Sequence, residues 1–180
     1  MTRQESTIYI KADRINYYAF FSKAYWMDWL LHSEQYCIRC YLLALRREEY
    51  YTIHRPVRLL KYFYRRKKNV WGQKLGFFMH AGNFGLGLKI YHYGRIIVHP
   101  KARIGQNCTI HGDCCIGSKG TYPDLAPRIG NNVDIGQGAQ VLGNICIADG
   151  VIIGAGAIVT KSVTEPDVTI AGVPAKIIRK

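Results

Sequence analysis

The 180-residue chain lacks a long apolar run. No stretch approaches the roughly 18 residues that a membrane-spanning helix needs. Its start, MTRQESTIYIKADR, also lacks the apolar core and small-residue cleavage site of a secretory signal. With 48% hydrophobic and 21% charged residues, the composition is typical of a globular protein. We therefore expect a cytoplasmic protein, peripheral at most to the inner membrane face.

Acidic residues are scarce. The chain has 25 Lys and Arg against 12 Asp and Glu, which gives a net charge of +13. The surplus is uneven, because residues 1–80 hold 15 basic and 6 acidic side chains and residues 81–180 hold 10 and 6. A positive field attracts anionic lipid, nucleic acid or a polyanionic cofactor. Charge alone does not choose among these partners.

The cysteines lack the spacing of a metal site. Cys37 and Cys40 form a single C-x-x-C pair with no second pair after it, and Cys114 stands directly beside Cys115. A structural zinc site requires four ligands at matched spacing. We therefore expect no metal and interpret the cysteines as packing residues.

Helical periodicity marks the first part of the chain. Between residues 17 and 71, apolar and aromatic side chains recur at three- and four-residue spacing. Ser22 and Ser33 are candidate helix N-caps, and Pro56 marks a break before a second, basic helix with the sequence VRLLKYFYRRKK. That helix either contacts an anionic membrane surface or packs with a solvated Lys/Arg face. We predict an α-helical N-terminal region over residues 1–76.

A six-residue period governs the second part of the chain. Ile or Val recurs at every sixth position from Val98, with one interruption, and a small or modest residue often follows four positions later. A strict six-residue repeat is typical of a parallel β-helix, in which each coil uses three short strands. The branched positions are Val98, Ile104, Ile110, Ile116, Ile129, Ile135, Val141, Ile147, Ile153 and Val159.

The repeat is interrupted once, between Ile116 and Ile129, where the step is thirteen residues instead of twelve. The intervening segment, GSKGTYPDLAPR, contains two Gly and two Pro, so we predict a loop over residues 117–128. We predict that the β-helical domain, with its C-terminal tail, covers residues 77–180.

Two further segments stand out, FGLGLKIYHYGRIIVHPKARIG and the C-terminal IGAGAIVTKSVTEPDVTIAGVPAKIIRK. They resemble the hexapeptide-repeat acyltransferases, which are left-handed β-helices, and in particular their serine acetyltransferase-like and capsular polysaccharide O-acetyltransferase branch. The resemblance implies a mainly β, left-handed parallel β-helix after the N-terminal helices, and acetyl transfer from acetyl-CoA to a hydroxyl. It also implies that His92 is the general base. A neutral imidazole, whose ordinary pKa is about 6.5, is able to accept the hydroxyl proton.

The resemblance assigns further residues to the site. Tyr91, His111 and Asp113 are implied to contact the acceptor, and His111 either does so or faces solvent. The residues implied to contact the cofactor are Gln137, Ala139, Ala155, Thr160, Lys161, Lys176 and Arg179. Basic groups near phosphates form charge-assisted hydrogen bonds, although Lys176 and Arg179 are also consistent with a solvated tail.

The sequence departs from the serine acetyltransferases in two places. The segment GFFMHAGNFG lacks the carboxylate that orients the histidine in those enzymes, and Ala126 stands where a second histidine is found. Asp113 is a candidate replacement for the missing carboxylate.

These departures favour O-acetylation of a sugar in a surface polysaccharide or its lipid-linked precursor. Serine O-acetylation for cysteine biosynthesis is the alternative. A zinc carbonic anhydrase-like β-helix is a distant third, because four histidines are present in the region (His80, His92, His99, His111). The resemblance further implies a homotrimer, in which the 117–128 loop lies beside a neighbour's cofactor groove, and we expect no nucleic-acid partner.

Overall fold

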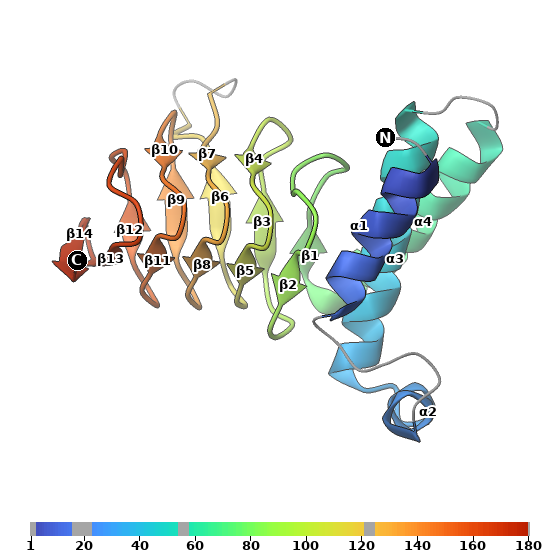
Figure 1. Cartoon of the computed structure of the whole chain (residues 1–180). Helices are drawn as coiled ribbons and strands as arrows, with labels where there is room; N and C mark the ends of the chain where they lie inside the picture. Colours follow the sequence, from blue (N-terminus) through green and yellow to red (C-terminus); the bar gives the residue numbers. More distant parts are fainter. Residues whose placement is uncertain (1–2, 16–22, 54–57, 121–124, 180) are drawn as a thin grey trace.

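The computed structural model describes residues 3–15, 23–53, 58–120 and 125–179. Helices pack at one end, and short parallel strands then stack along one axis towards the C-terminus at the other end (Figure 1). The predicted order, an α-helical region followed by a parallel β-helix, is confirmed.

Within the described residues, four helices form the N-terminal end. They are α1 (Arg3–Ile15), α2 (Lys23–Leu30), α3 (Glu34–Ile53) and α4 (Arg58–Leu75). Helix α1 precedes residues 17–71, the segment with helical periodicity. Ser33 is the N-cap of α3, since its hydroxyl accepts a hydrogen bond from the Tyr36 N–H at 3.3 Å. The predicted cap at Ser22 and the break at Pro56 lie outside the described residues.

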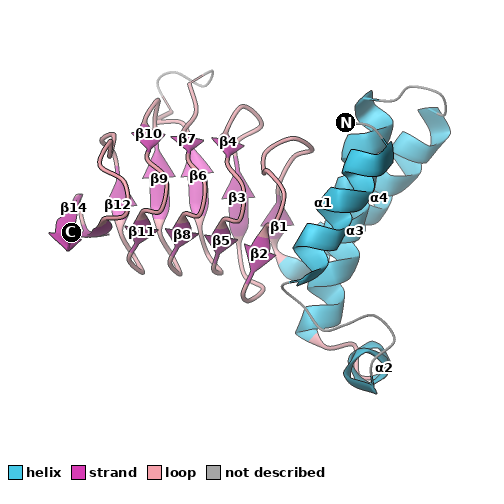
Figure 2. Ribbon diagram, in the orientation of Figure 1, coloured by secondary structure: helices cyan, strands magenta, loops and turns pink. Residues whose placement is uncertain are grey.

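The strands form three sheets, and successive strands alternate among them, so that the coils stack into a three-sided prism. Figure 2 shows the rows of strands from the side. The first sheet has the order β1-β3-β6-β9-β12, the second β10-β7-β4 and the third β14-β13-β11-β8-β5-β2. All pairs are parallel except β13 with β14. The bounds are β1 (Phe77–Phe78), β2 (Lys89–Ile90), β3 (Ile96–Val98), β4 (Arg103–Ile104), β5 (Thr109–Ile110), β6 (Cys115–Gly117), β7 (Arg128–Ile129), β8 (Asp134–Ile135), β9 (Gln140–Leu142), β10 (Cys146–Ile147), β11 (Ile152–Ile153), β12 (Ile158–Val159), β13 (Thr169–Gly172) and β14 (Ala175–Arg179).

The six-residue period reflects the register of the coils. Ile110 pairs with Ile135, and Ile135 pairs with Ile153, so one inward column runs through the third sheet. All ten predicted branched positions are buried. Burying such a side chain stabilises the fold by about 1.5–3 kcal/mol, so the column specifies the register as well as the core.

Close coil packing explains two further features of the repeat. A Cβ atom at Gly105 would lie 2.6 Å from the Gly130 carbonyl oxygen of the next coil, so a side chain does not fit there. The thiols of Cys108 and Cys114 are buried, and each lies 3.2 Å from a carbonyl oxygen of the next coil. The interpretation of these two cysteines as small buried residues is therefore confirmed.

A buried ion cluster fastens the helices to the first coil. The Arg46 guanidinium, from α3, lies 2.7 Å from the Asp13 carboxylate of α1 and 3.0 Å from Glu49. It also donates to the Phe84 carbonyl at 2.9 Å, while Asp13 accepts a hydrogen bond from the Leu88 N–H at 3.0 Å. These contacts fix the position of α3 relative to the segment that connects β1 to β2.

The interruption of the repeat lies between β6 and β7, where the chain leaves the stack. Residues 121–124 of this predicted loop are outside the described part of the chain. None of the described helices combines the length and apolar character that a membrane span requires.

Candidate active site

His92 lies on an edge of the prism. The turns over residues 91–95, 111–114, 136–139 and 154–157 each lead from the third sheet to the first and are stacked on one another. The Gly138 N–H donates to the Gly112 carbonyl at 3.0 Å, and the Gly156 N–H donates to the Gln137 carbonyl at 2.8 Å. We call this column of turns the His92 edge.

The His92 ring faces solvent beside the first turn of α3. Its side chain is 65% exposed, and Nδ1 lies 3.3 Å from a carboxylate oxygen of Glu34. The other Glu34 oxygen accepts a hydrogen bond from the Tyr93 N–H. With a proton on Nδ1 facing Glu34, Nε2 is left with a lone pair for an acceptor hydroxyl.

Glu34 is the contact of His92 that the sequence did not reveal. It stands 58 residues before His92, on another element. The only local signal is the N-cap Ser33, which predicts that Glu34 is in the first turn of a helix. Negative charge is favoured there by the helix dipole, but no sequence pattern indicates which turn the helix faces.

A second histidine lies on the same edge. The Tyr91 ring stacks on the His111 ring, with centroids 4.5 Å apart and planes at 9°, and the Lys89 ammonium lies 4.1 Å from the Tyr91 centroid. His111 Nε2 is 3.3 Å from the Asp134 carboxylate. The structure thus brings Tyr91, His92 and His111 together on adjacent coils.

Asp113 does not supply the missing carboxylate to His92. Its Oδ1 accepts a hydrogen bond from the Arg95 N–H at 3.0 Å, and its φ of 62° places it at the turn itself. In the described part of the chain, Glu34 is the carboxylate that contacts the His92 ring. Asp113 therefore stabilises the turn that follows His92 through this hydrogen bond.

Four of the predicted cofactor residues divide between two edges, while Lys176 and Arg179 lie on β14. Gln137 and Ala155 are exposed on the His92 edge. Thr160 and Lys161 follow β12, on the edge between the first and second sheets, where the Lys119 ammonium lies 3.1 Å from the Thr160 carbonyl. We call this second column of turns the Lys161 edge; the 117–128 loop leaves from it.

Ala139 is placed differently from its prediction. Its side chain is fully buried, its N–H donates to the Gly136 carbonyl at 3.1 Å, and its carbonyl accepts from the Cys115 N–H at 3.0 Å. Both backbone groups are already paired within the prism. Ala139 therefore forms the core beneath the His92 edge and offers no free amide to a cofactor.

The remaining cofactor candidates fit a phosphate-bearing group. Among the described residues, none accepts a hydrogen bond from the exposed Ala155 N–H. Lys161, Lys176 and Arg179 are exposed, and within the described ranges no carboxylate pairs with them. Free amides and cations are the groups that bind a nucleotide-linked thioester such as acetyl-CoA.

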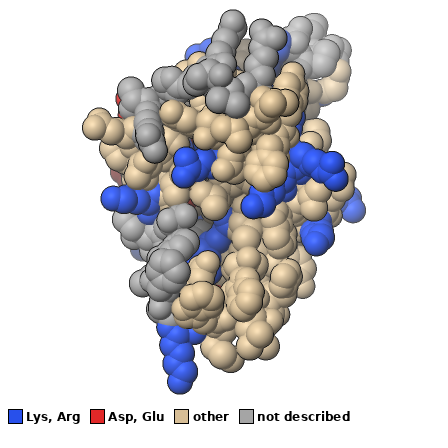
Figure 3. Space-filling view, turned by 90° about the vertical axis from the view of Figure 1, so that its right-hand side faces the viewer, with Lys and Arg blue, Asp and Glu red and all other residues tan. Residues whose placement is uncertain are grey.

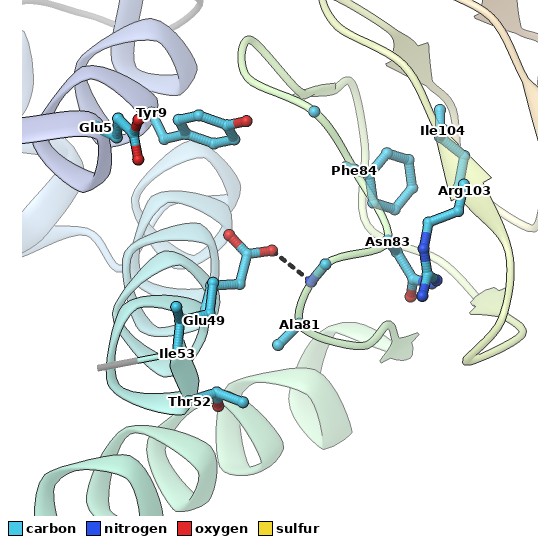
Figure 4. Close-up of a pocket in the computed structure, with 12 residues that line it drawn as sticks. Glu5, Tyr9, Glu49, Thr52, Ile53, Ala81, Asn83, Phe84, Arg103 and Ile104 are labelled. Carbon is cyan, nitrogen blue, oxygen red and sulfur yellow. Dashed lines mark hydrogen bonds between the residues drawn. The ribbon is translucent and has the colours of Figure 1, made fainter. Parts of the chain in front are cut away.

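A cavity of about 640 Å³ lies elsewhere, between α1, α3 and the first coil (Figure 4). Tyr9, Glu49 and Arg103 are among its lining residues, and Glu49 accepts a hydrogen bond from the Gly82 N–H at 2.8 Å. It contains none of the residues that the sequence assigned to the site. Within the residues that the structure describes, no three His, Cys, Asp or Glu gather as a metal site.

No protein-family model matches the chain. A serine acetyltransferase of Helicobacter pylori strain J99 is 33% identical over 159 residues, which cover 86% of this chain and 86% of that protein. The chain belongs to the serine acetyltransferase family. A serine acetyltransferase of Buchnera aphidicola is 40% identical over 102 residues, covering 56% of this chain but 39% of that protein. The chain thus spans about two fifths of the length of this longer relative.

The solved structures agree with the family. A serine acetyltransferase of Brucella abortus in complex with coenzyme A superposes with a TM-score of 0.70 at 28% identity, covering 98% of this chain and 67% of that one. The likeness confirms the left-handed β-helix that the resemblance implied.

The expected glycan acceptor is wrong. The relatives that match, at up to 40% identity, are named serine acetyltransferases, and nothing in the comparisons indicates a capsular or polysaccharide branch. The same relatives favour the serine alternative over the carbonic anhydrase-like one. The segment GFFMHAGNFG has no carboxylate for His92, but in the structure the Glu34 carboxylate contacts the His92 ring.

Proposed function

We propose that this protein is an acetyl-CoA-dependent acetyltransferase that acylates the hydroxyl of serine. The observation that supports it most directly is the solvent-facing His92 ring with Glu34 on Nδ1, in a member of the serine acetyltransferase family. A histidine held in one orientation by a carboxylate, with its second nitrogen in solvent, is the arrangement that a general base requires.

His92 performs the proton transfers. The serine oxygen forms a bond to the thioester carbonyl carbon, and the carbon–sulfur bond breaks. Nε2 of His92 takes the hydroxyl proton and then delivers it to the departing sulfur, so that the products are O-acetylserine and the thiol of CoA. The imidazole ends the cycle neutral, and no acyl-enzyme is required.

Glu34 supports this step through charge. While His92 holds the extra proton, its ring is an imidazolium, and the carboxylate 3.3 Å from Nδ1 stabilises that state. The Tyr93 N–H holds the second Glu34 oxygen and keeps the carboxylate turned to the ring. Glu34 is therefore a positioning residue in place of the carboxylate missing from GFFMHAGNFG.

The substrates are proposed to meet on the His92 edge. Tyr91, His111 and Asp113 remain the predicted contacts of the acceptor, and the Ala155 N–H and Gln137 those of the cofactor. Lys176 and Arg179, together with Lys161 of a neighbouring protomer, are proposed to bind its phosphates. Acetyl-CoA supplies the activated acetyl group, and holding it beside the acceptor lowers the entropic barrier to transfer.

The deciding experiment supplies purified protein with acetyl-CoA and L-serine and measures CoA thiol release and O-acetylserine by mass spectrometry. We expect serine-dependent release, and a loss of about 10²- to 10⁴-fold in His92→Ala. His32→Ala, at a histidine on the helical end, is the matched control and keeps its activity. Thiol release that does not depend on serine, or an active His92→Ala protein, would contradict the proposal.

A further inference from the structure

The outer face of α4 is apolar and aromatic. Leu59, Tyr62, Phe63 and Val70 are 79%, 60%, 55% and 43% exposed. Their spacing of three, one and seven residues places them on one stripe of the helix, opposite the side that packs on α3. Large apolar side chains gathered on one surface of a protein mark a contact site.

Basic side chains border this stripe. Helix α4 contains Lys and Arg along its length and no Asp or Glu. On its inner side, Arg65 and Lys68 pair with Glu48 of α3 at 2.7 Å and 2.9 Å. The outward ones have no ion-pair partner among the described residues. These outward residues are Arg66, Lys67 and Lys74.

The basic groups lie over the aromatic ones. The Lys67 ammonium is 5.9 Å from the Phe63 centroid, and the Lys74 ammonium is 5.1 Å from that of Trp71. The space-filling view of the helical end shows many Lys and Arg side chains among uncharged residues and hardly any Asp or Glu (Figure 3). Apolar stems topped by cations are typical of helices in the membrane interface.

The apolar end of α2 adjoins the same helix. The His32 ring, two residues beyond α2, lies 6.1 Å from the Trp71 ring of α4. Trp29, Leu30 and Leu31 are 49%, 68% and 69% exposed. A tryptophan beside exposed leucines suits the boundary between headgroups and acyl chains.

Charge and apolar surface together indicate which partner binds the outer face of α4. A second copy of this chain across a two-fold axis would bring α4 cations opposite α4 cations, which costs free energy. A nucleic acid would match the cations but leave Leu59 and Val70 without an apolar partner. An anionic bilayer provides both phosphate headgroups and acyl chains.

We propose that the outer face of α4, with the adjoining end of α2, binds the surface of an anionic lipid bilayer. The helix lies in the plane of the interface, with Phe63 and Leu59 among the acyl chains and Arg66 and Lys67 at the phosphates. The β-helix then extends away from the bilayer, because the helices are at one end of the molecule and the C-terminus at the other (Figure 1). This contact is independent of the proposed acetyl transfer.

The test is co-sedimentation of the full chain with vesicles of phosphatidylcholine, alone or mixed with phosphatidylglycerol. We expect binding only to the anionic vesicles, weakening as salt is added. All three tryptophans of the chain lie on α2 and α4, so their fluorescence should shift to the blue on binding.

Two pairs of variants locate the surface. The double reversal Arg66→Glu with Lys67→Glu should weaken partitioning by at least about tenfold. The same reversal at Arg103 and Arg128, which are exposed on the second sheet, changes the net charge equally and should have a smaller effect. Phe63→Ser should also weaken binding, whereas Ile152→Ser, at an exposed position of the third sheet, should not.

Four outcomes would overturn the proposal. They are no binding to anionic vesicles, equal binding to neutral ones, equal loss in both charge reversals, and a self-association in solution that Phe63→Ser abolishes without any vesicle binding. Serine acetylation measured without vesicles should be unchanged in Arg66→Glu/Lys67→Glu. A failure of the membrane-binding proposal is therefore distinguishable from a failure of the proposed acetyltransferase function.

Discussion

The contact between His92 and Glu34 joins a turn of the β-helix to the first turn of a helix. Its strength depends on charge, because a hydrogen bond to a charged partner contributes about 1.5–3 kcal/mol and a neutral one about 0.5–1.5. The additional stabilisation from a charged partner applies to the state in which His92 carries the extra proton. Replacing the carboxylate by an amide of the same shape separates this electrostatic role from packing.

We therefore expect Glu34→Gln to lower kcat about tenfold while leaving the KM for acetyl-CoA nearly unchanged. Glu34→Ala, which also removes the acceptor of the Tyr93 N–H, should lower kcat further. Glu165→Gln, the same change on another edge of the prism, is the control. If Glu34→Gln raised the KM and left kcat alone, Glu34 would be a binding group instead.

The two buried thiols provide a second residue-scale prediction. Burial raises the pKa of both Cys108 and Cys114 to about 11, from an ordinary value of 9.0. Between these values the folded chain binds more protons than the unfolded one. The free energy of unfolding should therefore fall as the pH rises from about 9 to about 11.

Urea unfolding at several pH values tests this dependence. The variant Cys108→Ala/Cys114→Ala should show a flatter slope over the same window, whatever its absolute stability. If the free energy of unfolding fell with pH equally in the two proteins, groups other than these thiols would cause the loss of stability.

At the scale of elements, the buried cluster around Arg46 connects α1, α3 and the first coil. Arg46 is fully buried and contacts Asp13 and Glu49. Burial raises the pKa of Asp13, and the neighbouring guanidinium opposes that shift. Removing the cation leaves two carboxylates buried without their partner.

Arg46→Met should thus lower the free energy of unfolding by about 3–5 kcal/mol. The neighbouring Arg47 is only half-buried, so Arg47→Met is the matched control and should have little effect. Denaturant unfolding compares the two. Equal stability of both variants would show that the cluster contributes no net stabilisation.

The elements also show how far the sequence predicts this molecule. The repeat of Ile and Val gave the register, because each branched side chain must point into the prism. The pairing of His92 with Glu34 was not predictable in this way. It depends on how α3 docks on the first coil, which is fixed by Asp13 of α1 and by Arg46, residues far apart in the sequence.

Ala139 shows the reverse case, a contact that was predicted but that its position in the structure does not support. Its position in the repeat was assigned to the cofactor from the resemblance, yet the same repeat places it at a buried position, where its amide is already bonded. Small residues at that point of the hexad fill the core, so an edge contact must come from the residues just before it, such as Gln137.

At the scale of the whole molecule, the division of the cofactor residues between two edges bears on assembly. Ala155 and Gln137 lie on the His92 edge, and Thr160 and Lys161 on the Lys161 edge, with the first sheet between them. One protomer has both sets of residues, but they lie at the two opposite edges of that sheet. A three-fold arrangement of prisms would set the Lys161 edge of one protomer against the His92 edge of the next.

The first sheet offers a surface for such packing. Phe78 and Ile97 are 61% and 40% exposed, and a groove of about 370 Å³ runs beside them. We expect the wild-type protein to be a homotrimer and Ile97→Glu to be a monomer, because a buried unpaired charge opposes association. Sedimentation equilibrium measures both, and Ile152→Glu on the third sheet is the control.

The monomer should also lose acetyl transfer although His92 and Glu34 are untouched, since its His92 edge lacks the neighbour's Lys161. Mixing Ile97→Glu with wild type should not restore the activity of the Ile97→Glu protein.

By contrast, His92→Ala and Lys161→Ala subunits that share one trimer should form one complete site between them. After co-refolding, the mixture should be more active than either variant alone. A fully active monomer would show instead that each prism holds the whole site.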